Sequence, residues 1–301
     1  MSVLDKAVSL ALPLVPKPIV GYFSRPYIAG PTRDDALRVV RELHAQGAMA
    51  TLDILGEFIT SLDQAEANTR AYIDLIRLLE SEKLPDANVS VKLTALGLLI
   101  DRARCLENVR RLVGAAAEAG RFVRIDMEDS QCTTPTLDIY RAVRSEFPGR
   151  VGVVLQSRLR RTIDDIESLA IEPSNFRLCK GIYLEPRIVA YTDPELIRSN
   201  FTLALERMLA HDAYVGIATH DERLVWSALR LIAKYDRTRD RYEFQMLLGV
   251  DEELRRILLN AGHRLRVYVP FGDQWYAYSV RRLRENPQIA GHALRALFSR
   301  S

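Results

Sequence analysis

The sequence predicts an α/β protein with a (β/α)8 TIM-like barrel, on two observations. Short runs of β-branched and aliphatic residues alternate eight times with longer amphipathic stretches. Such alternation is typical of parallel strands joined by helical crossovers. No G-x-G-x-x-G motif opens a helix after an early strand, as an open dinucleotide-binding sheet would require. Eight units in 301 residues therefore favour a closed barrel.

Eight segments have strand composition and are bounded by polar or turn residues. The predicted strands are Met49–Leu55, Val89–Leu96, Phe122–Glu128, Val151–Gln156, Phe176–Leu184, Tyr214–His220, Tyr242–Leu248 and Leu265–Phe271.

Apolar residues recur at helical spacing between these strands. The predicted helices are Leu62–Lys83, Asn108–Ala119, Thr136–Phe147, Leu196–Leu209, Asp221–Tyr235 and Asp251–Ala261. We expect Thr162, Asp221 and Asp251 to cap helix starts, and Gly47, Gly120, Gly149 and Gly262 to follow helix ends.

The ends of the chain are expected to add helices to the barrel. Residues 1–301 are predicted to form a single catalytic domain, in which residues 1–48 are an N-terminal helical segment packed on the barrel. A C-terminal helix is expected over the barrel mouth. Pro13 and Pro16 interrupt the first apolar stretch, which lacks a signal-peptide cleavage site. No membrane-spanning run is present, and a weak contact with a membrane surface stays open.

The bulk composition excludes several classes of protein. The formal net charge is +3, with 27% charged residues, so nothing favours nucleic acid as a partner. Cys105, Cys132 and Cys179 lie far apart and form no CxxC motif, which indicates a reducing compartment, and we expect a cytoplasmic location. The five histidines show no metal spacing, so we predict no metal site.

One face of several predicted strands is unusually polar. Alternate strand residues point into a barrel lumen, and here those positions carry charge and hydroxyl groups. The polar faces hold Thr51 and Asp53, then Ser90, Lys92 and Thr94, then Arg124, Asp126 and Glu128, and finally Arg266, Tyr268 and Pro270. Unpaired buried charges are costly. The set therefore predicts either an active site near the strand ends or lumen ion pairs without a catalytic role.

The sixth strand suggests a shape. Gly216, Ala218 and His220 share one face, and two small side chains leave room for a flat ring such as a flavin. Alternatively, a neighbouring side chain fills that space.

Two adjacent arginines follow the eighth strand. Arg281 and Arg282 fall on a predicted helix, where neighbours project about 100° apart and can grip one carboxylate from two sides. A solvated basic face is the alternative.

Eight motifs in order resemble the single-domain bacterial proline dehydrogenases, from about Thr51 to Pro287. They are LGE (Leu55–Glu57), VKLTAL (Val91–Leu96), RIDMED (Arg124–Asp129), VVLQ (Val153–Gln156), RLCKGIY (Arg177–Tyr183), ATH (Ala218–His220), YEFQMLLG (Tyr242–Gly249), and YVPFG followed by YSVRRLREN.

The resemblance implies a distorted barrel that binds FAD at its mouth without a Rossmann domain. It implies oxidation of L-proline to Δ1-pyrroline-5-carboxylate by hydride transfer to flavin N5, the first step of proline catabolism. A quinone would accept the electrons, which suggests peripheral membrane contact on the inner face of the cell membrane. A separate pyrroline-5-carboxylate dehydrogenase would take the product.

The resemblance also implies residue roles. Asp126 and Arg177 would be catalytic, with Arg177 near flavin N5 and Asp126 holding Arg177 or Lys92. The substrate would be bound by Lys92, Arg281 and Arg282 at its carboxylate, by Tyr268, Tyr278 and Leu247 around its ring, and by Glu57 through Arg281. FAD would contact Asp126, Met127, Gln156, Arg177, Lys180, Gly181, Ile182, Thr219 and His220, and Glu285 would anchor the last helix.

Three features depart from the family pattern or from the strand parity. Ile182 stands where the family often has alanine, and the segment from Gly272 to Tyr278 is short. Lys180 has the wrong parity for the lumen if Arg177 faces it, so either the strand bends or Lys180 acts from the rim. Rival functions are a flavin barrel acting on hydroxyproline or a folate, and a cofactor-free lyase or non-catalytic binding protein. In the family, a tyrosine at position 268 crowds a ring hydroxyl.

Overall fold

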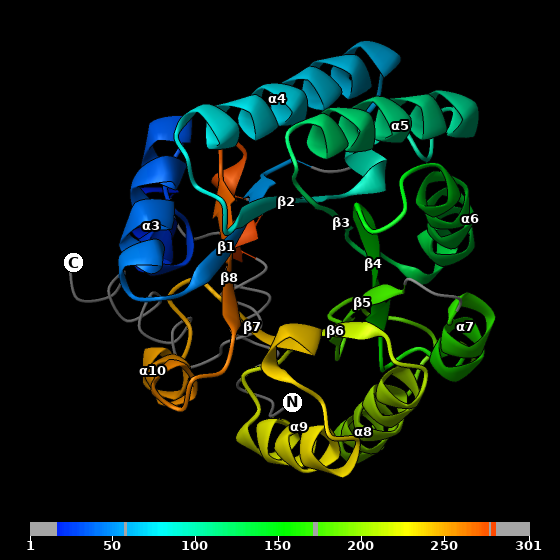
Figure 1. Ribbon diagram of the computed structural model, residues 1–301. Coiled ribbons are helices and arrows are strands. Elements are labelled where there is room, and N and C mark those ends of the chain that lie inside the picture. Colours follow the sequence, from blue (N-terminus) through cyan, green and yellow to red (C-terminus); the bar gives the residue numbers. More distant parts are fainter. Residues whose placement is uncertain (1–16, 57–58, 171–173, 277, 281–301) are drawn as a thin grey trace, which may run out of the picture.

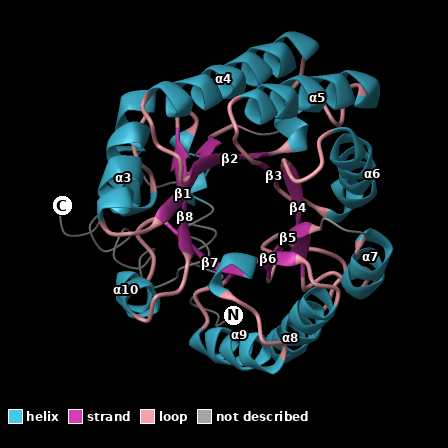
Figure 2. Cartoon of the chain, viewed as in Figure 1, coloured by secondary structure: helices cyan, strands magenta, loops and turns pink. Residues whose placement is uncertain are grey.

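A computed structural model describes residues 17–56, 59–170, 174–276 and 278–280. Eight parallel strands form a closed barrel in chain order, surrounded by helices (Figures 1 and 2). The strands are β1 (Met49–Ile54), β2 (Ala87–Val91), β3 (Val123–Ile125), β4 (Val151–Gln156), β5 (Asn175–Cys179), β6 (Tyr214–Ala218), β7 (Tyr242–Leu247) and β8 (Leu265–Phe271). The predicted fold class is confirmed.

Helices connect the strands and precede the first of them. Before β1 come α2 (Lys17–Ser24), the 3-10 turn η2 (Arg25–Tyr27) and α3 (Arg33–Ala45), as the expected N-terminal helices. The helices of the crossovers are α4 (Leu62–Ser81), α5 (Arg102–Glu118), α6 (Ser130–Glu146), α7 (Thr162–Leu169), α8 (Pro194–Ala210), α9 (Glu222–Lys234) and α10 (Glu252–Asn260), with 3-10 turns η3 (Leu93–Leu96) and η4 (Arg239–Arg241).

The first and last strands close the barrel. β1 pairs with β8 over its whole length, from Met49 opposite Arg266 to Ile54 opposite Phe271. This register places Thr51 beside Tyr268 and Asp53 beside Pro270. Polar residues of both chain halves therefore meet at the same end of the lumen.

The apolar core lies between the barrel and its helices. Strand residues such as Leu52, Val89, Ile125 and Val267 are fully buried and belong to one continuous apolar cluster with the inner helix faces. Each such side chain contributes about 1.5–3 kcal/mol on burial. The opposite strand parity points into the lumen, as the sequence predicted.

The lower lumen contains a layer of buried ionic groups. Arg266 donates to Glu243 from Nε (2.8 Å), and Arg124 donates to the side chain of Asn175. A Cβ atom at Gly152 would collide with Arg124, so glycine makes room for the guanidinium. We call Arg124, Glu243 and Arg266 the lower ionic layer.

Three predicted strands end at least three residues earlier than expected. β2 stops at Val91, because the chain turns into η3 and Thr94 binds Glu128: Oε1 accepts from Thr94 Oγ1 at 2.7 Å, and Oε2 accepts from Thr94 N at 3.3 Å. β3 stops at Ile125, before this Glu128 contact, and β5 stops at Cys179, with Gly181 at φ +91°. The predicted strand ends at Leu96, Glu128 and Leu184 were wrong.

Most predicted helix boundaries agree with the structure. Asp221 and Asp251 accept from backbone amides at the starts of α9 and α10. The four predicted glycines follow helix ends with positive φ. Thr162 is not a cap: it is the first residue of α7, and its hydroxyl donates to the Gln156 carbonyl.

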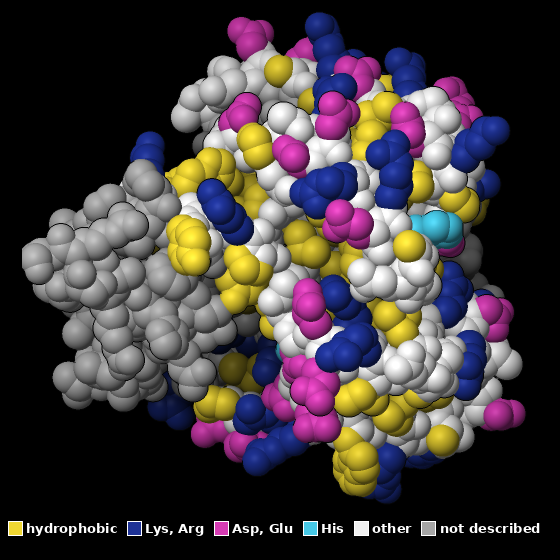
Figure 3. All heavy atoms as spheres, turned by 90° about the vertical axis from the view of Figure 1, so that its left-hand side faces the viewer, with side chains coloured by type: hydrophobic (Ala, Val, Ile, Leu, Met, Phe, Trp, Pro, Cys, Tyr) yellow, Lys and Arg dark blue, Asp and Glu magenta, His cyan; other side chains and the backbone are white. Residues whose placement is uncertain are grey.

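Charges of both signs are interspersed with hydrophobic side chains on the face shown in Figure 3. Within the described ranges, no helix combines the length and apolar character needed to cross a bilayer. Residues 1–16 and residues 281–301, where the C-terminal helix was predicted, lie outside the described residues. The single-domain division stays a prediction.

Candidate active site

A buried ion pair lies at the carboxyl end of the barrel strands. Arg177 on β5 donates from Nη2 to Asp126 Oδ1 (2.5 Å), and both side chains are 9% exposed. Nη1 of Arg177 donates to Ser90 Oγ on β2 (3.1 Å). Burial by itself lowers the pKa of Arg177, but Asp126 and Tyr268 outweigh it and the pKa is raised. The guanidinium is therefore a fixed positive charge.

Tyr268 on β8 joins this pair to a lysine. Its hydroxyl donates to Asp126 Oδ2 (2.8 Å) and accepts from Lys92 Nζ (3.3 Å). The Arg177 guanidinium lies 5.4 Å from the Tyr268 ring centroid, in a cation–π contact. Burial, with Asp126 and Asp53 nearby, raises the pKa of Tyr268 well above its usual value, so the hydroxyl keeps its proton at neutral pH.

Lys92 pairs with Asp53 rather than with Asp126. Its Nζ donates to Asp53 Oδ1 (2.8 Å) and Oδ2 (2.7 Å). Of the two expected partners of Asp126, the structure shows Arg177. Burial raises the pKa of Asp53 against the opposing effect of Lys92, and Asp126 raises it further.

Gln156 and Gly181 approach closely beside Arg177. Gln156 Nε2 donates to the Glu128 carbonyl oxygen (2.6 Å), which fixes the amide at the end of β4. Gly181 has φ +91°, and a Cβ atom there would collide with Gln156 Oε1. Met127 is buried nearby in sequence, directly after Asp126. Only a residue without a side chain fits at position 181.

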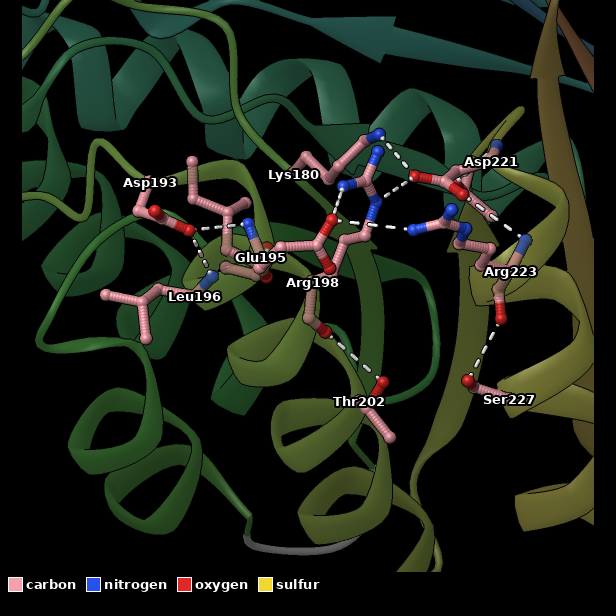
Figure 4. Close-up of polar contacts among 12 residues, drawn as sticks. Lys180, Asp193, Glu195, Leu196, Arg198, Thr202, Asp221, Arg223 and Ser227 are labelled. Carbon is pink, nitrogen blue, oxygen red and sulfur yellow. Dashed lines mark hydrogen bonds and ion pairs between the residues drawn. The ribbon is translucent and has the colours of Figure 1, made fainter.

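Lys180 lies in a charged network at the barrel rim (Figure 4). Its Nζ donates to Asp221 Oδ2 (3.0 Å), which also accepts from Arg198 Nε (2.7 Å). Glu195 accepts from Arg198 Nη1 (2.7 Å) and from Arg223 Nη1 (3.5 Å). Because β5 ends at Cys179, Lys180 lies at the rim, where strand parity no longer fixes its direction. We call these five residues the rim network.

Thr219, His220 and Leu247 lie at or directly after strand ends, whereas Ile182 follows β5 in a loop and Tyr278 lies in the helical residues after β8. Thr219 Oγ1 accepts from the Asp221 amide, and His220 Nε2 accepts from the Leu247 amide (2.8 Å). Ile182 is 40% exposed, and Tyr278 is buried.

The space at Gly216 is filled. A Cβ atom there would lie 2.5 Å from Gln245 Nε2. The structure therefore shows the alternative interpretation at this position: a neighbouring side chain, and not a flat ring, fills the space beside Gly216.

Comparisons with known proteins decide the family. The family described as proline dehydrogenase matches residues 36–294. The chain is 36% identical to the proline dehydrogenase of Deinococcus radiodurans over 277 residues, which cover 90% of this chain and 88% of the relative. It is 34% identical to proline dehydrogenase 2 of Bacillus subtilis over 270 residues, with 90% and 88% covered.

The chain belongs to the proline dehydrogenase family. It is therefore an oxidoreductase, which excludes the cofactor-free lyase and the non-catalytic binding protein. Among solved structures, it resembles proline utilization A of Bdellovibrio bacteriovorus inactivated by N-propargylglycine, with a TM-score of 0.83 and 27% identity. That similarity covers 88% of this chain but 32% of the longer protein.

Four predicted site residues of this proline dehydrogenase lie outside the described residues. They are Glu57, Arg281, Arg282 and Glu285. The described helical residues 275–276 and 278–280 lead directly toward the arginine pair.

Sequence reasoning gave no role to several residues that complete the site. Asp53 was placed on a polar face without a partner, and Tyr72 fitted the apolar face of α4. Arg198 and Asp221 carried only a helix pattern and a cap. One feature of the sequence could have indicated these residues: there are more carboxylates near the predicted strand ends than the predicted site has roles for.

No group of three or more His, Cys, Asp or Glu side chains that could hold a metal ion occurs in the described part of the chain.

Proposed function

We propose that this enzyme oxidises L-proline to Δ1-pyrroline-5-carboxylate with FAD as its cofactor. The observation that supports this most strongly is that Arg177 on β5, Tyr268 on β8, Asp126 after β3 and Lys92 after β2 converge on one buried site. A fixed cation, a neutral hydroxyl and a paired lysine in one place suit a small zwitterionic substrate next to a ring that gains negative charge.

The residues present fit FAD. Arg177 supplies a buried positive charge, and the rim network adds three cations against two carboxylates. The starts of α8 and α9, capped by Asp193 and Asp221, lie in the same network (Figure 4). Helix starts and cations favour phosphate groups.

When bound, FAD supplies a hydride acceptor at flavin N5. Beside it, Arg177 would stabilise the negative charge that develops on the reduced ring, because its guanidinium is held by Asp126 and Ser90 and needs no reorientation. We propose further flavin contacts for Met127, Gln156, Lys180, Gly181, Ile182, Thr219 and His220, and an anchoring role for Glu285.

The substrate carboxylate would be held by Lys92 together with Arg281 and Arg282. Two planar guanidinium groups and an ammonium can fix both carboxylate oxygens, which turns the C5 carbon rather than the α-carbon toward the acceptor. Tyr268, Tyr278 and Leu247 would pack around the ring, and Glu57 would pair with Arg281. The Tyr268 proton stays on the phenol, facing Asp126, so this tyrosine acts as a donor and not as a base.

We infer a quinone as electron acceptor and a cytoplasmic enzyme in peripheral contact with the membrane. Family membership supports both inferences. We also propose that a separate pyrroline-5-carboxylate dehydrogenase takes the product.

Anaerobic mixing of the purified enzyme with L-proline tests the proposal. We expect a yellow protein whose visible flavin absorbance bleaches on mixing. A colourless protein that cannot be reconstituted with FAD, or a flavoprotein that proline does not reduce, would contradict it.

A further inference from the structure

Asp53 is a buried carboxylate to which the proposed function gives no task. Its side chain is 1% exposed, and both of its oxygens accept from Lys92 Nζ, at 2.8 and 2.7 Å. The Lys92 side chain is 10% exposed. Lys92 is the first residue after β2, so its direction is not set by strand pairing.

Tyr72 supports Asp53 from behind. Its hydroxyl on α4 donates to Asp53 Oδ1 (3.3 Å) and accepts from the Ile54 amide (3.1 Å). Tyr72 is 2% exposed, so its position is set by core packing. Asp53 is thus held between a rigid helix residue and the lysine amine. A carboxylate fixed in this way determines where the amine points.

The charges of this cluster balance in pairs. Asp53 faces Lys92, and Asp126 faces Arg177, while Tyr268 bridges the two pairs. Asp126 already accepts from Arg177 and Tyr268. Removing the Asp53 charge would take away the carboxylate that receives both short contacts of Lys92 Nζ, so the amine would no longer be held in its present direction.

We propose that Asp53, supported by Tyr72, is a positioning residue that holds the Lys92 ammonium aimed at the substrate carboxylate. This inference rests on the proposed function, since Lys92 is assigned to the carboxylate there. Asp53 would act only through Lys92 and would not touch substrate or flavin.

The first test is Asp53→Asn, which keeps the shape and removes the charge. We expect the KM for L-proline to rise about 10- to 100-fold, the range for loss of a charge-assisted contact, with kcat reduced by less. The affinity for cyclopentanecarboxylate, a ring acid without the amine, should fall in parallel, while bound FAD is retained. Asp165→Asn is the matched control, because Asp165 is a buried carboxylate paired with Arg161 on α7. It should leave KM unchanged.

A double-mutant cycle separates positioning from general destabilisation. If Asp53 acts only through Lys92, Asp53→Asn should change KM by less than about twofold in a Lys92→Met background. An additive increase in that background would overturn the proposal, as would an unchanged KM in Asp53→Asn itself.

Tyr72→Phe covers the case in which Asp53→Asn does not fold. It removes one hydroxyl, and we expect a KM increase of about 2- to 10-fold. A wild-type KM in this variant would then overturn the proposal. Wild-type enzyme that fails to oxidise proline would instead reject the proposed function, so the two failures are distinguishable.

Discussion

Arg177 spans the lumen from β5 to Ser90 on β2, with Nη1 and Oγ 3.1 Å apart, while its other arm holds Asp126. This two-armed contact needs the planar fork of arginine, since one lysine amine cannot reach both partners in the same geometry. A mutation can therefore keep the positive charge at position 177 while it removes the two-armed contact that orients the group.

Arg177→Lys should keep the positive charge and lose the fork. We expect flavin reduction by proline to slow about 10- to 100-fold, measured by anaerobic stopped-flow absorbance. Arg161→Lys is the control and should reduce at the normal rate, because Arg161 is a more exposed arginine directly before α7 that pairs with Asp165. A normal rate in Arg177→Lys would remove the proposed role.

Tyr268 is expected to set the choice between proline and hydroxyproline. Tyr268→Phe removes the hydroxyl that joins Asp126 to Lys92, and should raise KM for proline about 2- to 10-fold. Tyr268→Ser opens space as well, so the ratio of kcat/KM for hydroxyproline to that for proline should increase. An unchanged ratio in Tyr268→Ser would contradict crowding by the ring.

Lys180→Met tests the rim network. Loss of this cation should weaken FAD binding by about 3- to 10-fold, a modest effect because the side chain is partly exposed. Titration of apoenzyme with FAD, followed by flavin fluorescence, measures the change. Lys234→Met, at another lysine paired with a carboxylate, should bind FAD normally. Equal affinities in both variants would count against a phosphate contact.

The arginine pair that follows Val280 carries the carboxylate prediction. Arg281→Met and Arg282→Met should each raise the KM for proline about 10- to 100-fold while FAD stays bound, since each removes a charge-assisted contact. Steady-state kinetics and flavin content check both. An unchanged KM in both variants would refute the proposed contact of these arginines with the substrate carboxylate.

Glu243 predicts how stability depends on acid. Burial alone raises its pKa, but Arg266, Tyr214 and Gln245 outweigh this and lower the pKa from 4.5 to about 2. A depressed carboxyl pKa stabilises the fold above the unfolded-state value, and that contribution is lost as pH falls from about 4.5 toward 2. It is on the order of 3 kcal/mol. Thermal unfolding of Glu243→Gln should show a lower Tm at neutral pH and a weaker acid dependence. If the Tm of Glu243→Gln fell as steeply at low pH as the wild-type Tm, the loss of stability in acid would belong to other groups.

The barrel could be predicted because its signal is periodic. Alternation within strands separates residues such as Leu52 and Val267, which face the helices, from Asp53 and Arg266, which face the lumen. That parity depends only on neighbouring residues in the chain.

Strand ends and pairings depend on distant residues instead. β2 turns at Lys92 because Glu128, three residues after the end of β3, binds Thr94. The partner of Lys92 is set by the stagger of strands around the barrel, which brings Asp53 rather than Asp126 to its amine. Tyr72 shows the same limit, because helical spacing indicates burial but not the carboxylate that its hydroxyl meets.

The lower ionic layer has an implication for redesign of this enzyme. Arg124 donates to Val153 on β4 and Asn175 on β5, while Arg266 donates to Glu243 on β7 and to the Ala50 carbonyl on β1. These contacts link neighbouring strands beneath the mouth and use none of the residues proposed to meet the ligand. The residues at the barrel mouth can therefore be varied by directed evolution toward other cyclic amino acids while the polar contacts between strands below them are kept.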